Sequence, residues 1–382
     1  MRILFASPYP PARDGIGTYT QILGGALRAA GHEVAVVAVR ADQGAGREVI
    51  GALGPWGATD RLRSAVADFD PDLVHVQFAV PAFGARTPAL VRWLAELARI
   101  PVPIVTTLHE PSRDTALLHG PGRALYRRIA RLSDHLIVHT KGALDTLTGP
   151  LAVSHAEVIP HFSTPPPEPV STADELRERF GLGAARLLLA FGYIHVDKGL
   201  NDLVQALVLM HRRDSRTLRD VRLVVAGAVR PRSGPFRVFE ARDRLHLALV
   251  RRSAKRGGVA DRLVFTGFVP GDDIAAWFDA AETVVLPYRK AEQSGVANLA
   301  RAYGVPVIAT TAGGLGELFA GSPGTVSPRS PERLAETLAA FLATEPGITV
   351  PQGPQDAELG TVAAATTAVY RTAVAGPRGR SL

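Results

Sequence analysis

Short runs of β-branched and other apolar residues alternate with helical stretches, such as residues 18–30 and 88–99, from one end of the chain to the other. Each run ends in glycine, proline or a polar cluster, an order typical of βαβ units in parallel sheets. Six runs in the first half are predicted strands: residues 3–6, 34–39, 73–76, 103–108, 135–138 and 156–160. Five follow in the second half: residues 186–192, 222–227, 262–267, 283–287 and 305–310. The alternation predicts an α/β fold with two doubly wound, Rossmann-like parallel sheets.

A proline-rich segment, FSTPPPEPVST at residues 162–172, separates the two sets of runs. Proline cannot continue a helix or a central strand, so this segment is predicted to link two domains. A chain of 382 residues is also too long for one ordinary core. The expected division is a first domain at 1–164, a linker region at 165–180 and a second domain at 181–355. Residues 356–382 are expected to form a C-terminal helix and a tail, and this helix is a candidate to pack across both domains. Two such domains place the carboxyl ends of their strands around a central cleft.

Composition excludes several kinds of site and location. The chain has no cysteine, so a disulfide framework, a thiolate zinc site and a thiol nucleophile are excluded. Prolines at positions 8, 10 and 11 interrupt the N-terminal apolar run, which does not fit a signal peptide. No segment approaches the roughly 20 apolar residues of a membrane-spanning helix. We therefore expect a cytoplasmic protein.

The charge balance narrows the kinds of ligand. Forty-three Lys and Arg residues against 36 Asp and Glu residues give a net charge of +7, which suits phosphate-bearing ligands or anionic membrane surfaces. No basic stripe is interleaved with aromatic residues, so nucleic-acid binding is not expected. Asp68, Asp70 and Asp72 precede their strand, at the end of the sheet opposite the cleft, so no metal site is expected there.

The loop after the first strand, SPYPPARDGIGTYT at residues 7–20, holds Gly15 and Gly17 just before a helix. Bare backbone N–H groups and the positive end of a helix suit a phosphate or a sugar oxygen. Dinucleotide binding would need a third glycine, where the chain has Thr20, and the second strand ends at Arg40 without a ribose-binding acid. Nicotinamide binding is therefore disfavoured. A plain turn without a ligand stays open as an alternative.

His109 and Glu110 come directly after the strand PIVTTL, at the edge where a parallel sheet presents its ligands. A histidine there can donate to a sugar hydroxyl or stabilise developing charge near neutral pH. The alternative is a histidine that only caps a loop. Five other histidines are interpreted as structural: His119, His135, His139, His155 and His161.

Two stretches of the second half predict a diphosphate site. FGYIHVDKGLNDL, residues 191–203, places Tyr193, His195 and Lys198 at the start of a helix, where a diphosphate can bind. A lysine in a first helical turn opposes the helix dipole, so a compensating anion is expected. In AEQSGVANLARAYGVPVIATTAGGLGE, residues 291–317, another helix starts immediately after a strand at the tetrapeptide QSGV, and its N–H groups form a second anion cradle. Glycines at positions 313 and 314 then permit another close approach.

These stretches together resemble the retaining GT-B glycosyltransferases of family 4. The resemblance rests on motifs in the expected order over nearly the whole chain: GIGTYT, GHEVAVVA, PDLVHVQ, TTLHE, VIPH, FGYIHVDKGL, LVVAG, VFTGFVP, and QSGV followed by YGVPVIATTAGGLGE. It implies a first domain on the acceptor side and a second domain that binds a nucleotide-sugar donor, a UDP- or GDP-sugar. It also implies no metal, no cofactor and no protein nucleophile, because the leaving phosphate helps to deprotonate an acceptor hydroxyl on the same face.

The resemblance also assigns roles to residues. His109 is implied beside the transferred sugar as the catalytic residue. The implied donor-binding residues are Gly15, Gly17, Tyr193, His195, Lys198, Val269, Glu292, Gln293, Ser294, Gly295 and Val296. The acceptor-side candidates lie in the same motifs: Asp14, Tyr19, Gln77 and Glu110. The acceptor itself, a glycan, a glycolipid or a small natural product, and the oligomeric state are not readable.

The sequence departs from the family pattern at the second cradle. Two glutamates eight positions apart are common there, but the register puts Ala291 and Leu299 at these positions, with Glu292 one residue away. Two alternatives therefore stay open: a non-catalytic GT-B subunit that binds a nucleotide, and a pseudo-glycosyltransferase acting on cyclitol-like substrates.

The segment GRALYRRIAR carries four arginines, Arg123, Arg127, Arg128 and Arg131. They fit a weak association with an anionic membrane, although a solvated helix face is the favoured interpretation.

Overall fold

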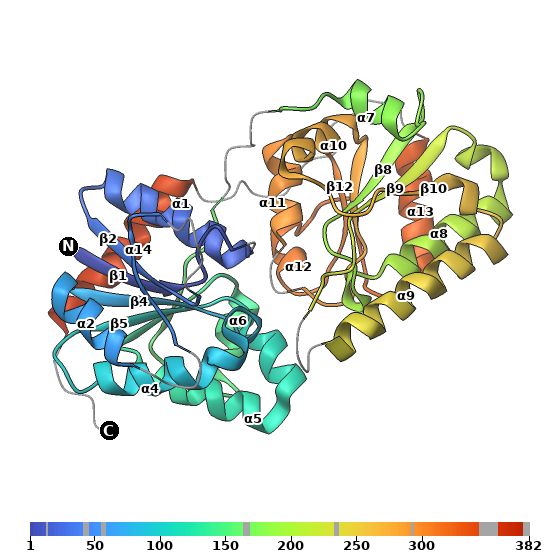
Figure 1. Cartoon of the computed structure of the whole chain (residues 1–382). Coiled ribbons are helices and arrows are strands. Elements are labelled where there is room, and N and C mark those ends of the chain that lie inside the picture. The colour runs from blue at the N-terminus through green and yellow to red at the C-terminus, as the bar shows by residue number, and fades with distance from the viewer. Residues whose placement is uncertain are drawn as a thin grey trace. The chain divides into compact units, whose positions relative to one another are not determined.

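The computed structural model describes residues 1–12, 14–40, 46–54, 59–162, 169–232, 237–291, 294–343 and 358–376. The chain divides into two compact units (Figure 1). Unit 1 comprises Met1–Phe162 with Asp356–Leu382, and unit 2 comprises Ser163–Gln355. Each unit is an α/β fold on one parallel sheet, as the alternation predicts. Among the described helices, none has the length and apolar character needed to span a membrane.

Seven parallel strands form the sheet of unit 1, in the order β3-β2-β1-β4-β5-β6-β7. They are β1 Arg2–Ser7, β2 Glu33–Ala38, β3 Val49–Ala52, β4 Leu73–Phe78, β5 Ile104–Leu108, β6 His135–Val138 and β7 Ala156–Val158. In the register, Phe5 of β1 pairs with Val36 of β2 and with His75 of β4. Six strands coincide with predicted runs. The edge strand β3 was not predicted, because four residues that include a glycine give a weak strand signal.

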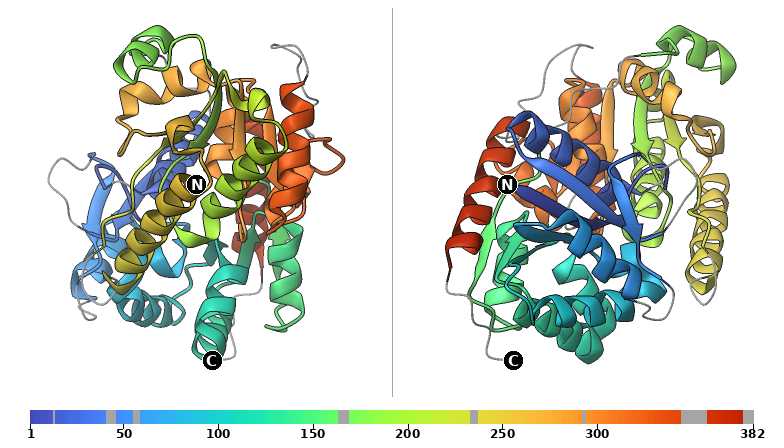
Figure 2. Two further views of the ribbon diagram at one scale, coloured as in Figure 1. Left: turned by 90° about the vertical axis from the view of Figure 1, so that its right-hand side faces the viewer. Right: turned by 60° about the vertical axis from the view of Figure 1, so that its left-hand side comes forward.

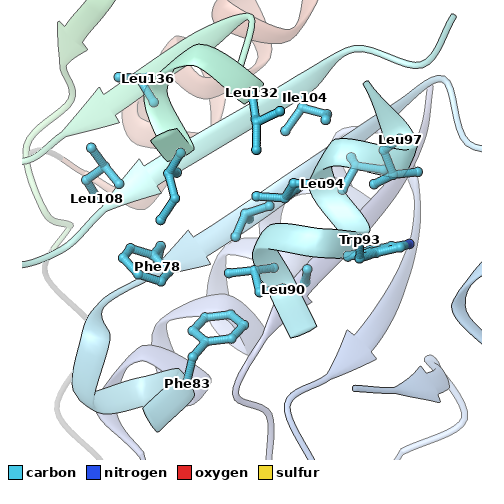
Figure 3. Close-up of a cluster of buried hydrophobic side chains, with 14 of the residues drawn as sticks. Phe78, Phe83, Leu90, Trp93, Leu94, Leu97, Ile104, Leu108, Leu132 and Leu136 are labelled. Atoms are coloured by element: carbon cyan, nitrogen blue, oxygen red, sulfur yellow. The ribbon is translucent and has the colours of Figure 1, made fainter. Parts of the chain in front are cut away.

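Two hydrophobic cores cover the two faces of this sheet, because successive strand residues point to opposite sides. Leu4 belongs to one core and Phe5 to the other. Figure 3 shows part of the first core, with Phe78 of β4 and with Leu90 and Trp93 of α4 (Thr87–Leu97) among the side chains drawn. The first six helices of the unit are α1 Gly15–Ala29, α2 Asp60–Phe69, α3 Val80–Phe83, α4 Thr87–Leu97, α5 Pro111–Leu132 and α6 Lys141–Thr148.

The last helix of the chain, α14 (Leu359–Ala375, red in Figures 1 and 2), packs in unit 1 against α1 and β5. Its buried positions recur at intervals of three and four residues, as expected for a helix with one apolar face. Val362, Val369 and Tyr370 are buried in the second core of the unit. That core is therefore completed by a segment from the far end of the chain.

Unit 2 contains a six-stranded parallel sheet in the order β10-β9-β8-β11-β12-β13. The strands are β8 Arg186–Phe191, β9 Val221–Ala226, β10 Leu263–Phe265, β11 Thr283–Leu286, β12 Val307–Thr310 and β13 Thr325–Val326. Its helices are α7 Ala173–Arg179, α8 Leu200–Arg213, α9 Arg237–Arg256, α10 Ile274–Ala280, α11 Gly295–Ala302, α12 Gly314–Leu318 and α13 Pro331–Leu342. As in unit 1, one hydrophobic core lies on each face of the sheet.

Helix α7 lies within the segment expected to be a linker. Its N-terminus is a capping box, in which the Thr172 hydroxyl accepts from the N–H of Glu175 (3.2 Å) and the Glu175 carboxylate accepts from the N–H of Thr172 (2.8 Å). Leu176 is fully buried and joins a core of unit 2. The end of the expected linker is thus part of the folded second unit.

Candidate functional site

In unit 1, the residues that follow β4 and β5 lie at the carboxyl edge of the sheet. His109 comes directly after β5, and its backbone N–H donates to the carbonyl of Phe78 at the end of β4 (2.9 Å). Its side chain is buried, with 5% of its surface exposed. Parallel α/β sheets present their ligand sites at this edge. The structure therefore places His109 at the edge where the sequence predicts it.

A chain of buried polar side chains connects His109 to the last helix. Gln77 Oε1 accepts a hydrogen bond from His109 Nε2 (2.7 Å), and Gln77 Nε2 donates to His75 Nε2 (3.3 Å). His75 Nε2 also lies 2.8 Å from the hydroxyl of Thr107, and His75 Nδ1 lies 2.6 Å from the hydroxyl of Tyr370 in α14. With Gln77 Oε1 as the acceptor, His109 carries its proton on Nε2 and leaves Nδ1 free to accept.

Two further histidines and a tyrosine pack beside His109. The ring centroids of His109 and His139 are 4.9 Å apart, those of His139 and His161 are 5.5 Å apart, and Tyr19 of α1 lies edge-on to His109 at 5.3 Å. The sequence interpretation treats His139 and His161 as structural, yet both lie in this cluster. They follow β6 and β7, so the strand-end position used to select His109 could have selected them too.

Burial keeps His75, His109 and His139 neutral. Desolvation, reinforced by neighbouring histidines, lowers the pKa of His109 well below its usual value. The same two causes lower the pKa values of His75 and His139 to about 3. His139 Nδ1 donates to the carbonyl of Ile159 (2.8 Å), which fixes its tautomer. At neutral pH the His109 imidazole is therefore uncharged.

Asp14 and the two glycines after it form the start of α1. The Asp14 carboxylate accepts from the N–H groups of Ile16 (2.9 Å) and Gly17 (3.3 Å). A Cβ at Gly17 would lie 3.2 Å from the backbone of Pro8, whereas a Cβ at Gly15 would have no neighbour within 4 Å. Gly17 thus permits close packing, and Asp14 already occupies two of the N–H groups predicted to meet a phosphate. The helix end remains open beside Gly15.

The remaining acceptor-side candidates differ in exposure. Glu110 is partly exposed and forms an ion pair with Arg113 in the first turn of α5. Tyr19 is 5% exposed and packs against His109, and Gln77 is fully buried and hydrogen-bonds to His109. Asp114, in the same turn as Arg113, is also buried and accepts from Val80 N–H (2.9 Å) and the Tyr126 hydroxyl (2.7 Å). Asp114 therefore anchors α5.

In unit 2, the loop after β8 carries Lys198 to the carboxyl edge of the sheet. Lys198 ends a short 3₁₀ turn, η3 (Val196–Lys198), and its Nζ lies 3.5 Å from the carbonyl oxygen of Phe191. The next residue, Gly199, has a left-handed backbone with φ of 66°. A Cβ there would overlap the carbonyl oxygen of Pro287, at 1.8 Å. Glycine is therefore required for this loop to pack on the chain that follows β11.

A small pocket lies beside Lys198, and Gly192, Tyr193 and Tyr288 are among its lining residues. Gly192 has φ of 93°, and a Cβ placed on it would lie 3.1 Å from Lys198 Nζ and 3.5 Å from the side chain of Val296. The loop after β8 and the start of α11 therefore meet at Gly192. Two residues that the sequence assigns to donor binding, Lys198 and Val296, are thereby brought together.

Ser294 is the N-cap of α11. Its Oγ accepts from the N–H of Ala297 (3.1 Å), and a Cβ on Gly295 would meet nothing within 4 Å. The first turn of a helix leaves N–H groups without intrahelical partners, so this end favours an anion. Glu292 and Gln293 lie outside the described residues, and their assignment to the donor stays a prediction.

The other predicted donor residues lie at different places along the same sheet. Tyr193 has the guanidinium of Arg230 5.6 Å from its ring centroid. His195 is the N-cap residue of η3, without a capping bond from its side chain. Val269, which comes after β10, is partly buried against a core of unit 2. Of these, Tyr193 lines the pocket beside Lys198.

A partly buried ion pair that the sequence interpretation missed holds the loop after β11. Arg289 Nε and Nη2 lie 2.7 and 2.5 Å from the two carboxylate oxygens of Asp202 in α8. The N–H of Arg289 also donates to the carbonyl of Asp197 in η3 (2.7 Å). These contacts tie the turn that carries Lys198 to the segment ahead of α11. Asp202 and Arg289 are 87 positions apart, and no local pattern pairs them.

The two positions where the family resemblance expects glutamates are apolar and contribute to packing. Ala291 and Leu299 lie partly buried against the same core of unit 2. In the part of the chain that the structure describes, no group of three or more histidine, aspartate or glutamate side chains is arranged to hold a metal ion. The ammonium of Lys198 is a charged group among the residues that line the pocket beside it.

Two protein-family models match the chain. One, described as Glycosyltransferase Family 4, matches residues 13–162, and the other, described as Glycosyl transferases group 1, matches residues 185–344. The first match lies in unit 1 and the second in unit 2. Both sheet edges described above are therefore covered by these matches.

Individual proteins also resemble the chain. D-inositol 3-phosphate glycosyltransferase of Xylanimonas cellulosilytica is 30% identical over 272 residues, which are 66% of this chain. The matched region spans 61% of that protein, which is less than two thirds of its length. GDP-mannose-dependent alpha-(1-6)-phosphatidylinositol monomannoside mannosyltransferase of Mycobacterium tuberculosis is 28% identical over 378 residues, 89% of this chain and 88% of that protein. Among solved structures, sucrose-phosphate synthase from Thermosynechococcus elongatus matches with a TM-score of 0.70 at 19% identity, covering 97% of this chain and 98% of that one. The structural match supports the GT-B fold.

Proposed function

Since the chain belongs to the family 4 glycosyltransferases with the GT-B fold, we propose that it transfers a sugar from a nucleoside diphosphate sugar to an acceptor hydroxyl, with retention at the anomeric carbon. One observation carries this proposal, the meeting of Lys198, Gly192 and the start of α11 at one edge of unit 2. An ammonium group beside a helix N-terminus favours a diphosphate.

For the donor, we propose UDP or GDP as the nucleotide. Lys198 would supply a point charge, and the first N–H groups of α11 would supply hydrogen bonds to phosphate oxygens. These groups would offset the charge of a diphosphate without a metal cation, so the proposal includes binding without a metal ion. Gln293 and Glu292 are proposed to complete the phosphate contacts, and the backbone near Val269 to lie beside the base.

For the chemistry, we propose that the acceptor oxygen attacks the anomeric carbon from the face that the diphosphate leaves. The bond to the leaving oxygen breaks, and the hydroxyl proton passes to an oxygen of the departing phosphate. No covalent sugar–protein intermediate forms. The role proposed for His109 is to hold the transferred sugar while positive charge develops on that sugar. A neutral imidazole whose Nε2–H donates to Gln77 leaves Nδ1 as an acceptor for a sugar hydroxyl.

For the acceptor, we propose a molecule that contains an inositol ring. The two relatives described above are named for D-inositol 3-phosphate and for a phosphatidylinositol monomannoside. Their shared inositol supports a polyhydroxylated ring, and the basic character of the chain fits a phosphate on it. The cytoplasmic location of the protein remains a prediction from its sequence.

Ala291 and Leu299 support two alternatives, because they replace acids that commonly contact the donor in the resembling family. In the first alternative, the protein binds a nucleotide and supports a partner enzyme without catalysis. In the second, it transfers a cyclitol-like pseudo-sugar. Both alternatives retain the diphosphate contacts of unit 2 and differ from the main proposal in what is transferred.

A two-stage experiment tests the proposal. UDP, GDP and their sugars are first screened by thermal shift, since a ligand of the folded state raises the melting temperature. The stabilising donor is then incubated with inositol phosphates, and the anomeric configuration of the product is read from the NMR coupling of its anomeric proton. A product with the donor's configuration supports the proposal. Inversion contradicts retention, and nucleotide binding without turnover of any donor favours the non-catalytic alternative.

A further inference from the structure

Helix α9 of unit 2 (yellow in Figure 2) carries large aliphatic side chains that are exposed to solvent. Val238, Leu245 and Leu249 are 65%, 62% and 54% exposed. They belong to a row of residues that recur at intervals of three and four and therefore share one side of the helix. This row, the α9 stripe, consists of Val238, Arg242, Leu245, Leu249, Arg252 and Arg256. All six are exposed, so the stripe is an unpartnered surface.

The exposed charges of α9 have a single sign. Seven basic side chains of the helix are exposed: Arg237, Arg242, Arg244, Arg251, Arg252, Lys255 and Arg256. The helix has two acids, and both are less exposed and paired, Glu240 with Arg244 and Asp243 with Arg232. Among the described residues, Arg252, Lys255 and Arg256 form no ion pair with a carboxylate. The surface is therefore complementary to an anionic partner.

A groove of about 370 Å³ runs beside the C-terminal half of the stripe. Its walls come from α8, α9 and α13, and Arg212, Arg252 and Arg256 line it together with one carboxylate, Glu332. Leu249 lines the same groove. Guanidinium groups bind phosphate oxygens with directed hydrogen bonds, so three of them around one groove suit a phosphate group.

The combination of aliphatic and basic residues indicates what kind of anion fits. A solvated helix face carries charges of both signs, and a single-stranded nucleic acid is bound through aromatic residues on which bases stack. The α9 stripe has neither feature. Leucines flanked by arginines match the boundary between phospholipid headgroups and acyl chains, where the leucines enter the apolar layer and the arginines stay with the phosphates.

We infer that the α9 stripe docks on the surface of an anionic phospholipid bilayer, with a headgroup phosphate in the groove lined by Arg212, Arg252 and Arg256. This surface is separate from the pocket beside Lys198. The inference goes beyond the proposed transfer reaction and does not depend on it. It also differs from the expectation based on α5, whose Arg127 already donates to the carbonyl of Pro150.

Co-sedimentation of the full chain with vesicles tests this inference. We expect binding to vesicles of phosphatidylcholine with phosphatidylglycerol, little binding to phosphatidylcholine alone, and weakening as salt is added. The variants L245S/L249S and R252E/R256E should each bind anionic vesicles about tenfold more weakly, or worse, because one removes the apolar and the other the electrostatic attraction. The matched control R123E/R128E, on α5, should bind like the unaltered protein. Circular dichroism and melting temperature establish that each variant is folded.

Three results would overturn the inference. Equal binding to neutral and anionic vesicles, or no binding to either, removes the anionic bilayer as the partner. Loss of binding in R123E/R128E, with binding retained in both α9 variants, moves the surface to α5. The third result comes from measuring the binding of single-stranded RNA by the same two α9 variants. If R252E/R256E loses affinity for both vesicles and RNA while L245S/L249S keeps both, the surface is a polyanion site without lipid insertion. None of these readouts uses sugar transfer, so a failure here is distinct from a failure of the proposed function.

Discussion

At the scale of single residues, the two candidate sites rely on opposite electrostatic conditions. His109 and His139 of unit 1 are buried and close to each other, so desolvation and the neighbouring histidines lower their pKa values and keep them neutral. Lys198 in unit 2 instead lines an open pocket, with a carbonyl oxygen and an aromatic ring near its ammonium. His109 is therefore suited to hydrogen bonding, and Lys198 to binding an anion.

Lys198→Ala should weaken the binding of UDP or GDP by about 1.5–3 kcal/mol, the usual contribution of a hydrogen bond to a charged group. Isothermal titration of the folded variant measures the change. Lys255→Ala, an exposed lysine on α9, is the matched control and should keep full affinity. An unchanged dissociation constant for Lys198→Ala would remove this residue from the diphosphate site.

His109→Ala should lower kcat and kcat/KM together by roughly a hundredfold to a thousandfold, because an interaction made mainly in the transition state is lost. Nucleotide affinity should hardly change. Steady-state kinetics beside a nucleotide titration measures both quantities. The control His119→Asn alters an exposed histidine of α5, and it should retain normal turnover. Near-normal kcat in His109→Ala would show that His109 is a structural loop residue.

Acidification should destabilise unit 1 through His139, whose pKa is about 3 in the folded chain against 6.5 for an exposed histidine. Between these values the unfolded chain binds a proton that the folded chain does not, so stability rises with pH and is lost as pH falls below 6.5. His139→Gln should flatten the slope by up to about 1.4 kcal/mol per pH unit. Urea unfolding at several pH values below 6.5 measures this slope. An identical slope in the variant would contradict a buried neutral His139.

At the scale of elements, α14 links the last part of the sequence to the candidate site of unit 1. Its Tyr370 meets His75 from 295 positions away, and His75 contacts the Gln77 that holds His109. In unit 2, the Asp202–Arg289 pair plays a comparable part, because it joins the start of α8 to the segment ahead of α11. In both units, the site is held by contacts between elements that are distant in sequence.

Tyr370→Phe should lower kcat by about 2- to 10-fold, the equivalent of one hydrogen bond, while KM stays nearly constant. The substitution keeps the ring in the core and removes the hydroxyl that orients His75, so Tyr370 is a positioning residue. Thr366→Val in the same helix is the matched control, since the buried Thr366 hydroxyl donates to the carbonyl of Val362 within the helix (2.7 Å). A similar loss of stability in both variants, with kcat reduced in neither, would reject the link to His109.

At the scale of the whole molecule, the chain consists of two α/β units that carry different parts of the proposed machinery. The groups suited to a diphosphate lie in unit 2, and His109 with its hydrogen-bond chain lies in unit 1. Each unit has its own sheet and its own cores, so a ligand of one unit need not alter the fold of the other.

UDP or GDP should protect η3 and the start of α11 from hydrogen exchange, and the protection should persist with a chelator present. The physical reason is that Lys198 and helix N–H groups are expected to offset the charge of the diphosphate without a metal cation. Hydrogen–deuterium exchange with mass spectrometry measures this, with uridine or guanosine as the control that lacks phosphates. Protection abolished by the chelator and restored by magnesium would refute metal-independent binding.

Local patterns in the sequence were sufficient for the fold class and for most of the strands, because the alternation of apolar runs and helices is visible within short windows. The same patterns placed His109, Lys198 and Ser294 at strand ends and helix starts, where parallel sheets present ligands. The match of two family models supports the identification by motif order.

Tertiary structure decided the rest, because the remaining contacts join residues that no short window contains. It attached α14 to unit 1, added β3 to the sheet, and brought His139 and His161 to His109. The ion pair of Asp202 with Arg289 and the contact of His75 with Tyr370 span 87 and 295 positions. Such pairs form only when the chain is folded, since burial and proximity, which set their strength, are properties of the packed structure.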